Sequence, residues 1–229
     1  MSVVKMPEEI QPKSLADQAY EILLNKIVFN EYQPGDKVSM RHLGDELQIG
    51  RTPISVAMSE LEHKTIVEKR LGSGTYIAPI RIDSVKAAHL MRAQVEKKVM
   101  ELAFPVLDAE AIAELVSIIN SMREGYEQND PHRVMKYDNL FHEKFYEISG
   151  YYKLWQWEQD FNIHFNRFRW LSLTLLKGDR DELIQVHLDM LDTIARSDFA
   201  KTSELIDQHY AGFDADFEKI MKTHPDYFG

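Results

Sequence analysis

Four side chains in the second half of the chain have the types and spacing of a metal site. Asp138 and His142 stand four residues apart in KYDNLFHEKFYEI, and on a helix this spacing places both side chains on one face, one turn apart. His187 and His209 lie in two further segments with helical periodicity. Three helices of a bundle can therefore direct one carboxylate and three imidazoles at a common interior point. This ligand set suits a divalent transition metal such as zinc, nickel or manganese.

The amino-acid composition indicates the general class of protein. The 229 residues suit one large or two modest domains, and 44% hydrophobic with 28% charged residues is typical of a soluble globular protein. The chain has no cysteine, which excludes disulfides and thiolate metal sites and fits a reducing compartment. The sequence shows no apolar run of membrane-spanning length and no apolar signal core at its start. We therefore expect a cytoplasmic protein with no membrane partner.

Charge is distributed unevenly along the chain. The net charge is −10, yet residues 1–80 hold nine Lys and Arg against eleven Asp and Glu, whereas the remainder holds 18 against 26. The acidity is thus concentrated in the C-terminal part. Because a small module with a local patch suffices for DNA contact, the overall charge does not exclude nucleic-acid binding by the first 80 residues.

The first 80 residues predict two helices, a turn, a third helix and a β-hairpin. Ser14 can cap SLADQAYEILLNKIVF, and Ser39 can cap MRHLGDEL after the helix-breaking NEYQPGD. Thr52 and Pro53 restart a helix over PISVAMSELEHK, with Thr52 as its expected cap. IVEKR and TYIAP then predict two short strands joined by LGSG. This order is typical of a winged helix-turn-helix, whose third helix enters the major groove.

The stretch PGDKVSMRHLGDELQIGRTPISVAMSELEHKTIVEKRLGSGTYIAPI resembles the GntR family of bacterial transcription regulators. It keeps the family's spacing from PG through the RTP turn to the G-x-G wing. The resemblance implies DNA contacts by Arg41, Arg51 and Thr52. It also implies that the wing tip, at Gly72 and Gly74, lies near the minor groove.

One position departs from the family pattern. Ser55 stands in PISVAM where the family usually has an arginine, in P-V-R-E-A-L. Serine can bond a phosphate or a base edge, but it cannot form a bidentate fork to guanine. Ser55 therefore stays a candidate DNA contact, and the operator sequence stays open.

After a linker near residues 80–83 the chain shows helical periodicity throughout. Turn and capping residues divide it into six segments, approximately 83–104, 108–128, 131–149, 151–177, 180–196 and 198–220. We therefore expect a mostly α protein with two domains, residues 1–80 and 81–229. The first is a winged helix-turn-helix and the second an antiparallel six-helix bundle.

The second domain resembles the FCD ligand-binding domain of the FadR subfamily of GntR regulators. The matching pieces are HLMRAQVEKKVMELA, the D-x-x-x-H of Asp138 and His142, QVHLDMLDTIARSDF and the late His209. The resemblance implies that the four predicted ligands match the family's metal pattern, and the six segments match its VanR-like branch. If no metal binds, the same polar cluster would hold an organic anion directly.

Candidate effector contacts also follow from this resemblance. Arg92 lies on the first bundle helix, where the family often places an arginine that points into the effector pocket and can pair with a carboxylate. His89 is a second candidate. His164 and Arg167, together with Arg169, are further candidate effector contacts in the aromatic-rich segment YYKLWQWEQDFNIHFNRFRWL, whose Phe and Trp residues are expected to pack in the core.

These patterns predict a transcription regulator, a repressor, and not an enzyme. A homodimer would bind a pseudo-palindromic double-stranded operator, and a small carboxylate metabolite at the metal site would modulate that binding. One alternative is a metal-dependent hydrolase fused to a DNA-binding module, but Glu143, which follows His142, points about 100° away on a helix and is not placed as a general base. Another alternative is a direct metal sensor without an organic effector.

Overall fold

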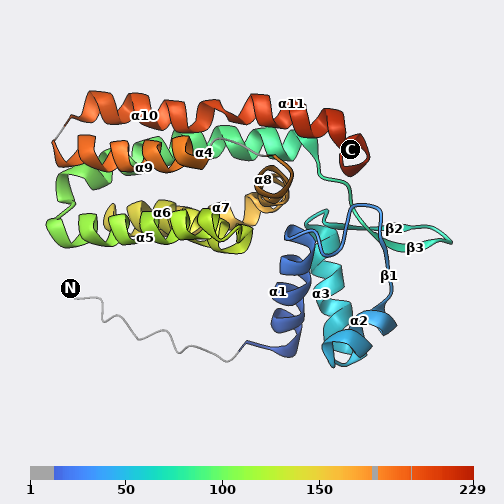
Figure 1. The fold of residues 1–229 in the computed structure, drawn as a ribbon. Coiled ribbons are helices and arrows are strands. Elements are labelled where there is room, and N and C mark those ends of the chain that lie inside the picture. Colours follow the sequence, from blue (N-terminus) through green and yellow to red (C-terminus); the bar gives the residue numbers. More distant parts are fainter. Residues whose placement is uncertain (1–12, 177–179, 197) are drawn as a thin grey trace, which may run out of the picture. The chain divides into compact units, whose positions relative to one another are not determined.

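The computed structural model describes residues 13–176, 180–196 and 198–229 (Figure 1). The chain divides into two compact units, of which the first ends at Ala78 and the second begins at Pro79. Within the described residues, no helix combines the length and the apolar character needed to cross a membrane.

The first unit is a winged helix-turn-helix, which confirms the predicted order of elements. Its strands form an antiparallel sheet in which β3 lies between β1 and β2. The elements in chain order are α1 Leu15–Val28, β1 Lys37–Val38, α2 Met40–Leu47, α3 Arg51–His63, β2 Val67–Arg70 and β3 Gly74–Ile77.

The capping residues of the first unit agree with the sequence at two helices and differ at the third. Ser14 and Ser39 cap α1 and α2. By contrast, α3 begins at Arg51 with Gly50 as its N-cap, so Thr52 lies inside the helix and the prediction that it caps the helix is wrong. Pro53 is tolerated at the third helical position because the first four helical N–H groups have no intrahelical acceptor.

The second unit contains eight α-helices within the described residues, instead of the predicted six. Figure 1 shows α4, α5, α6, α9 and α10 lying side by side, and the contacts between α5 and α6, α9 and α10, α4 and α6, α5 and α9, and α4 and α10 agree with this view. Their bounds are α4 Ile82–Ala103, α5 Ala109–Glu127, α6 Pro131–Ile148, α7 Tyr152–Phe161, α8 Ile163–Leu175, α9 Arg180–Ala195, α10 Phe199–Ala211 and α11 Phe213–Thr223. The mostly α fold class is confirmed.

The difference in number arises because two predicted helices are each interrupted by one residue. Asn162 separates α7 from α8, and Gly212 separates α10 from α11. Gly212 keeps φ −69° and ψ −15°, which are close to helical values. Such a small deviation barely disturbs the helical periodicity of the side chains, so the sequence does not reveal the break.

The core of the second unit has an apolar cluster at each end of α4. Val85 and Ala88 belong to a cluster with Phe168 and Ile220, whereas Val99 belongs to a larger cluster built on α5, α6, α9 and α10. Between them, α4 buries two charged side chains, Arg92 and Glu96, which are 3% and 1% exposed. A polar layer therefore interrupts the core at the level of these two residues.

Candidate metal centre and adjoining cavity

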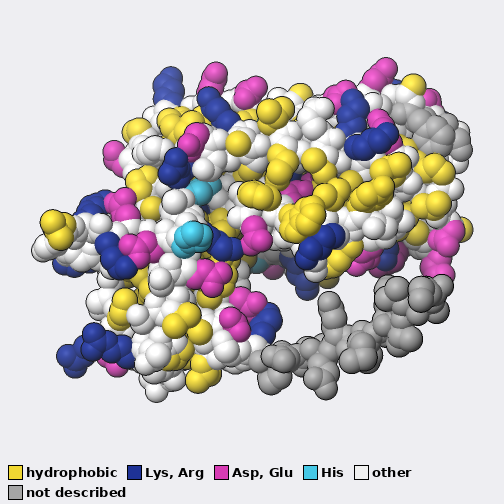
Figure 2. Space-filling view, turned by 180° about the vertical axis from the view of Figure 1, so that it is seen from behind, with side chains coloured by type: hydrophobic (Ala, Val, Ile, Leu, Met, Phe, Trp, Pro, Cys, Tyr) yellow, Lys and Arg dark blue, Asp and Glu magenta, His cyan; other side chains and the backbone are white. Residues whose placement is uncertain are grey.

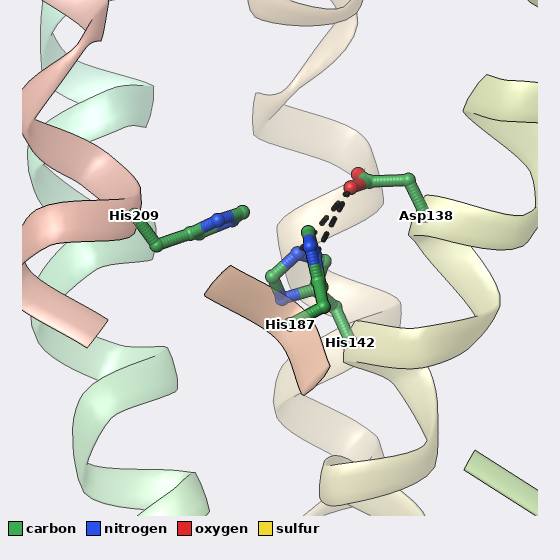
Figure 3. A group of neighbouring side chains, drawn as sticks. All are labelled: Asp138, His142, His187 and His209. Atoms are coloured by element: carbon green, nitrogen blue, oxygen red, sulfur yellow. Dashed lines mark ion pairs between the residues drawn. The ribbon is translucent and has the colours of Figure 1, made fainter. Parts of the chain in front are cut away.

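The structure brings all four predicted metal ligands together. Asp138 and His142 come from α6, His187 from α9 and His209 from α10, and one ligand atom of each lies within 4.8 Å of the others. Figure 3 shows the carboxylate and the three imidazoles converging from these helices. The four side chains are buried or nearly so, and that of Asp138 is 14% exposed.

The two carboxylate oxygens of Asp138 have different partners. Oδ1 faces the imidazoles, at 3.6 Å from His187 Nε2 and 3.9 Å from His142 Nε2, whereas Oδ2 forms an ion pair with Arg169. Burial raises the pKa of Asp138, but Arg169 and the three imidazoles lower it by more than burial raises it. The pKa of this carboxyl group therefore lies below its ordinary value. Asp138 is therefore a carboxylate with one oxygen left for a cation.

Neighbouring oxygen atoms contact two of the imidazoles and fix the proton position of one of them. His187 Nδ1 lies 2.7 Å from the Leu183 carbonyl oxygen and donates to it, and His142 Nδ1 lies 2.6 Å from Glu96 Oε2. His187 then carries the proton on Nδ1 and presents its Nε2 lone pair to the centre of the cluster, whereas the contact between His142 and Glu96 is an ion pair without the geometry of a hydrogen bond. Burial lowers the pKa of His187 and of His209, which favours the neutral, metal-binding form of the imidazole.

The cluster fits a divalent transition metal by the chemistry of its donors. Among the described residues, the buried nitrogens without a hydrogen-bond partner include His187 Nε2, His209 Nδ1 and both ring nitrogens of His142. Each unpaired buried polar group costs about 1–3 kcal/mol, and a cation at the centre of the cluster would bond one nitrogen of each ring. Because zinc bonds its nitrogen and oxygen ligands at about 2.0–2.2 Å, donor atoms that now lie up to 4.8 Å apart would move closer together around an ion.

A cavity of about 240 Å³ adjoins the cluster. Asp138, His142, His209 and Arg169 contribute to its lining, and so do Ser172 and Asp216, whose side chains share a 2.9 Å hydrogen bond. The remaining lining includes Arg92 and is otherwise largely aromatic, with a few aliphatic side chains; its aromatic side chains are His89, Tyr126, Phe165, Phe168, Tyr210 and Phe213. A ligand in this cavity would therefore meet a charged end and an apolar wall.

Arg92 lines the cavity, but two carboxylates already neutralise it. Its Nε lies 2.7 Å from Glu96 Oε1 and 3.0 Å from Glu158 Oε1. Tyr210 donates a hydrogen bond to Glu96, and Tyr146 donates one of 2.5 Å to Glu158. Arg92 thus lies in the cavity lining as predicted, its charge is paired within the protein, and its contact with an effector stays a prediction.

Glu96 and Glu158 are site residues that the sequence reasoning missed. The four-residue spacing of Arg92 and Glu96 on one helix was a visible signal for the first pair. Nothing in the sequence indicated Glu158, because it lies on a different helix.

Of the other predicted effector contacts, some line the cavity and others lie on a different face of their helix. His89 lines the cavity, and its ring stacks on Phe213 with centroids 3.9 Å apart. One face of α8 lines the cavity with side chains at the i, i+3, i+4, i+7 spacing, namely Phe165, Phe168, Arg169 and Ser172.

His164 and Arg167 lie on another face of α8, outside this lining. His164 Nδ1 accepts a hydrogen bond from the Arg81 amide at 3.3 Å. His164 and Arg167, predicted as effector contacts, therefore lie outside the cavity lining.

The predicted DNA contacts all lie on the first unit. Arg41 on α2 has a side chain that is 94% exposed, and Arg51 and Thr52 are exposed in the first turn of α3, whereas Ser55 is half-buried. Gly72 and Gly74 in the β2–β3 turn have φ values of 70° and 121°, a region that favours glycine. These residues are accessible on the surface, and their contact with DNA stays a prediction.

Two protein families match this chain. The model of the FCD domain matches residues 88–212, and that of the gntR family of bacterial regulatory proteins matches residues 15–77. The HTH-type transcriptional repressor RspR of Escherichia coli K12 is 20% identical over 211 residues, 92% of each chain. An uncharacterized HTH-type transcriptional regulator from an unstable DNA locus of Streptomyces ambofaciens is 22% identical over 91% of this chain and 87% of its own.

Solved structures support the fold. McbR/YncC of E. coli superposes with a TM-score of 0.76 at 15% identity, covering 91% of this chain and 99% of its own. A GntR regulator from Rhodococcus sp. RHA1 gives a TM-score of 0.67 at 16% identity, covering 90% and 97%. At these identities the likeness concerns the fold alone.

The geometry predicts the tautomer of His187 in metal-free protein at pH 7. Since Nδ1 donates to the Leu183 carbonyl, long-range ¹H–¹⁵N spectra should show a protonated Nδ1 and a lone-pair Nε2. Exposed His63 provides the reference for a ring whose tautomer is set by water. A protonated Nε2 on His187 would contradict the ligand arrangement described above.

Proposed function

This chain belongs to the GntR family of bacterial transcription regulators, in the group that carries an FCD domain, and from this premise we propose that it is a repressor controlled by a small carboxylate. The effector would bind beside a divalent metal ion in the second unit and change the affinity of the first unit for its operator. The observation that carries the proposal is the convergence of Asp138 with three imidazoles, whose unpaired nitrogens lie next to a cavity.

The chain supplies both the metal ligands and the groups that orient them. Asp138, His142, His187 and His209 would hold zinc, nickel or manganese. Arg169 fixes Asp138, while Glu96 and the Leu183 carbonyl fix two of the imidazoles, and such supporting partners typically change metal affinity by about 10–100-fold. The bound ion would supply a positive centre that attracts a carboxylate.

The cavity suggests the character of the effector. Its charged end holds the metal ligands and Arg169, and an anionic group of the effector would bind there. Phe165, Phe168 and Phe213 offer apolar surface to the remainder of the molecule. Ser172 and Asp216 could bond a hydroxyl or amino group. A carboxylate with a short apolar or aromatic body fits this lining.

The two alternatives from the sequence differ from this proposal in what they require. A hydrolase needs a general base beside the metal, but Glu143 accepts a hydrogen bond from Tyr152 at 2.9 Å and does not line the cavity. A direct metal sensor needs no organic effector. Operator affinity measured with metal alone, and then with added carboxylates, separates the sensor from the metabolite-controlled repressor.

We further propose that the protein acts as a homodimer. Two winged units on a pseudo-palindromic operator would combine two small footprints. Figure 2 shows hydrophobic side chains gathered over the helical bundle on one face of the molecule, and the second unit exposes Leu90, Trp157 and Phe161. An apolar surface of this kind favours protein association.

Light scattering should therefore give twice the mass of the 229-residue chain at micromolar concentration. A monomeric mass, both with and without operator DNA, would remove the dimer from the proposal.

Replacement of Arg51 tests the DNA interface. Arg51→Ala should weaken operator binding by about 1–3 kcal/mol for each lost base contact, and Arg41→Ala should also weaken it. Gel-shift titrations at fixed salt measure the effect. Arg196→Ala, an exposed arginine of the second unit, is the matched control and should bind like the parent. Equal binding by Arg51→Ala would exclude Arg51 from the interface.

Removal of metal tests the centre. Ligands that bind only the folded state stabilise it by about 2.7 kcal/mol at a hundredfold excess over Kd, so chelation should lower the Tm and added metal should restore it. His187→Ala should weaken metal binding and leave the first unit folded, while His63→Ala should retain metal. Elemental analysis after reloading with zinc, nickel and manganese gives the occupancy. A protein that stays metal-free, together with a His187→Ala variant that melts like the parent, would leave the cluster as an anion site.

A further inference from the structure

Helix α3 of the first unit has one buried and one exposed face. Its apolar side chains Ile54, Ala57, Met58 and Leu61 are buried, and α3 packs against α1. The exposed face carries a row of mostly small side chains at helical spacing, namely Arg51, Thr52, Val56 and Ser59. Val56 is unusual in this row because it is a β-branched apolar residue that is 53% exposed.

Charge indicates which part of this face approaches DNA. The first nine residues of α3, RTPISVAMS, contain one arginine and no acid, whereas Glu60 and Glu62 follow in the last turn. Phosphates are attracted to the first part and repelled by the second. The N-terminal turns of a recognition helix are also those that contact base edges in the major groove. Val56 therefore lies on the part of α3 that fits the groove.

The surroundings of Val56 do not favour a protein partner. The shallow hollow beside it is lined by Ser59, Glu60, His63 and Lys64 in addition to Val56 itself. An apolar protein interface needs a contiguous apolar patch, but here a single valine stands among polar side chains. A single exposed apolar side chain is instead suited to contact a single apolar group on a bound molecule.

Thymine presents such a group. In the major groove its C5-methyl is the apolar feature that distinguishes it, whereas serine and threonine hydroxyls bond donors and acceptors alike and discriminate little. In this row, Arg51 can bond guanine through two hydrogen bonds, and Val56 is the only side chain that is wholly apolar. We propose that Val56 contacts a thymine methyl in each operator half-site and so helps to determine the operator sequence.

This inference rests on the operator binding in the proposed function, but it does not depend on the metal centre. The operator is first selected from random duplexes with the full-length protein at fixed salt. Each thymine is then replaced by uracil, which removes only the C5-methyl group. At one thymine per half-site the wild-type protein should lose about fourfold in affinity, the effect of one buried methyl group.

Protein variants assign this loss to Val56. Val56→Ala should bind the thymine and uracil duplexes equally, whereas Val56→Thr, which keeps one methyl group, should retain part of the preference. Val106→Ala is the matched control, because Val106 is a 61% exposed valine of the second unit, and it should show the full fourfold preference. An unchanged melting temperature of Val56→Ala confirms that the substitution leaves the fold intact.

Two results would overturn the inference. One is a Val56→Ala variant that prefers thymine over uracil as strongly as the parent does. The other is a selected operator in which no thymine methyl affects binding. Failure to select any specific duplex would contradict operator binding itself and this inference with it, whereas specific binding without a methyl effect contradicts the inference alone.

Discussion

The second unit depends on the mutual neutralisation of charges that its helices bury. Glu96 lies at the centre of this network, in contact with Arg92, His142 and Tyr210, and Arg92 also reaches Glu158. Removing one partner of a buried ion pair costs about 3–5 kcal/mol, because the other charge is left uncompensated. The four helices that supply these groups, α4, α6, α7 and α10, are therefore fixed relative to one another by polar contacts as well as by the apolar clusters on either side.

The candidate metal ligands are held in place by contacts with side chains that are not themselves ligands. Two of the groups that contact the ligands come from helices that carry no ligand: Glu96 belongs to α4, and Arg169 belongs to α8. A cation would thus bind to side chains whose directions are already set, which lowers the entropic cost of assembling the site. Helix α8 thus carries both the cavity-lining Phe165 and Phe168 and the arginine that is paired with Asp138.

Local signals in the sequence were sufficient for much of this description. The four-residue spacing of Asp138 and His142 and the serine caps of α1 and α2 depend on neighbours within one turn, and the structure agrees with them. The break at Gly212 was missed because its backbone stays nearly helical. The pairing of Arg92 with Glu158 could not be predicted, since it depends on the packing of α4 against α7. For the same reason, the sequence could not decide which face of α8 lines the cavity.

The ends of the second unit show how a ligand in the cavity could affect the residues that follow the first unit. The Ile80 N–H donates to the Tyr227 carbonyl, and the Gly229 N–H donates to the Ile80 carbonyl, so the residues after α11 hold the backbone at Ile80. His164 on α8 accepts from the Arg81 amide. Both α8 and α11 also line the cavity. A ligand can shift an equilibrium only by its difference in affinity for two arrangements. Because α8 contacts both the cavity and Arg81, and the residues that hold Ile80 follow directly after α11, arrangements that differ in these helices would meet that condition.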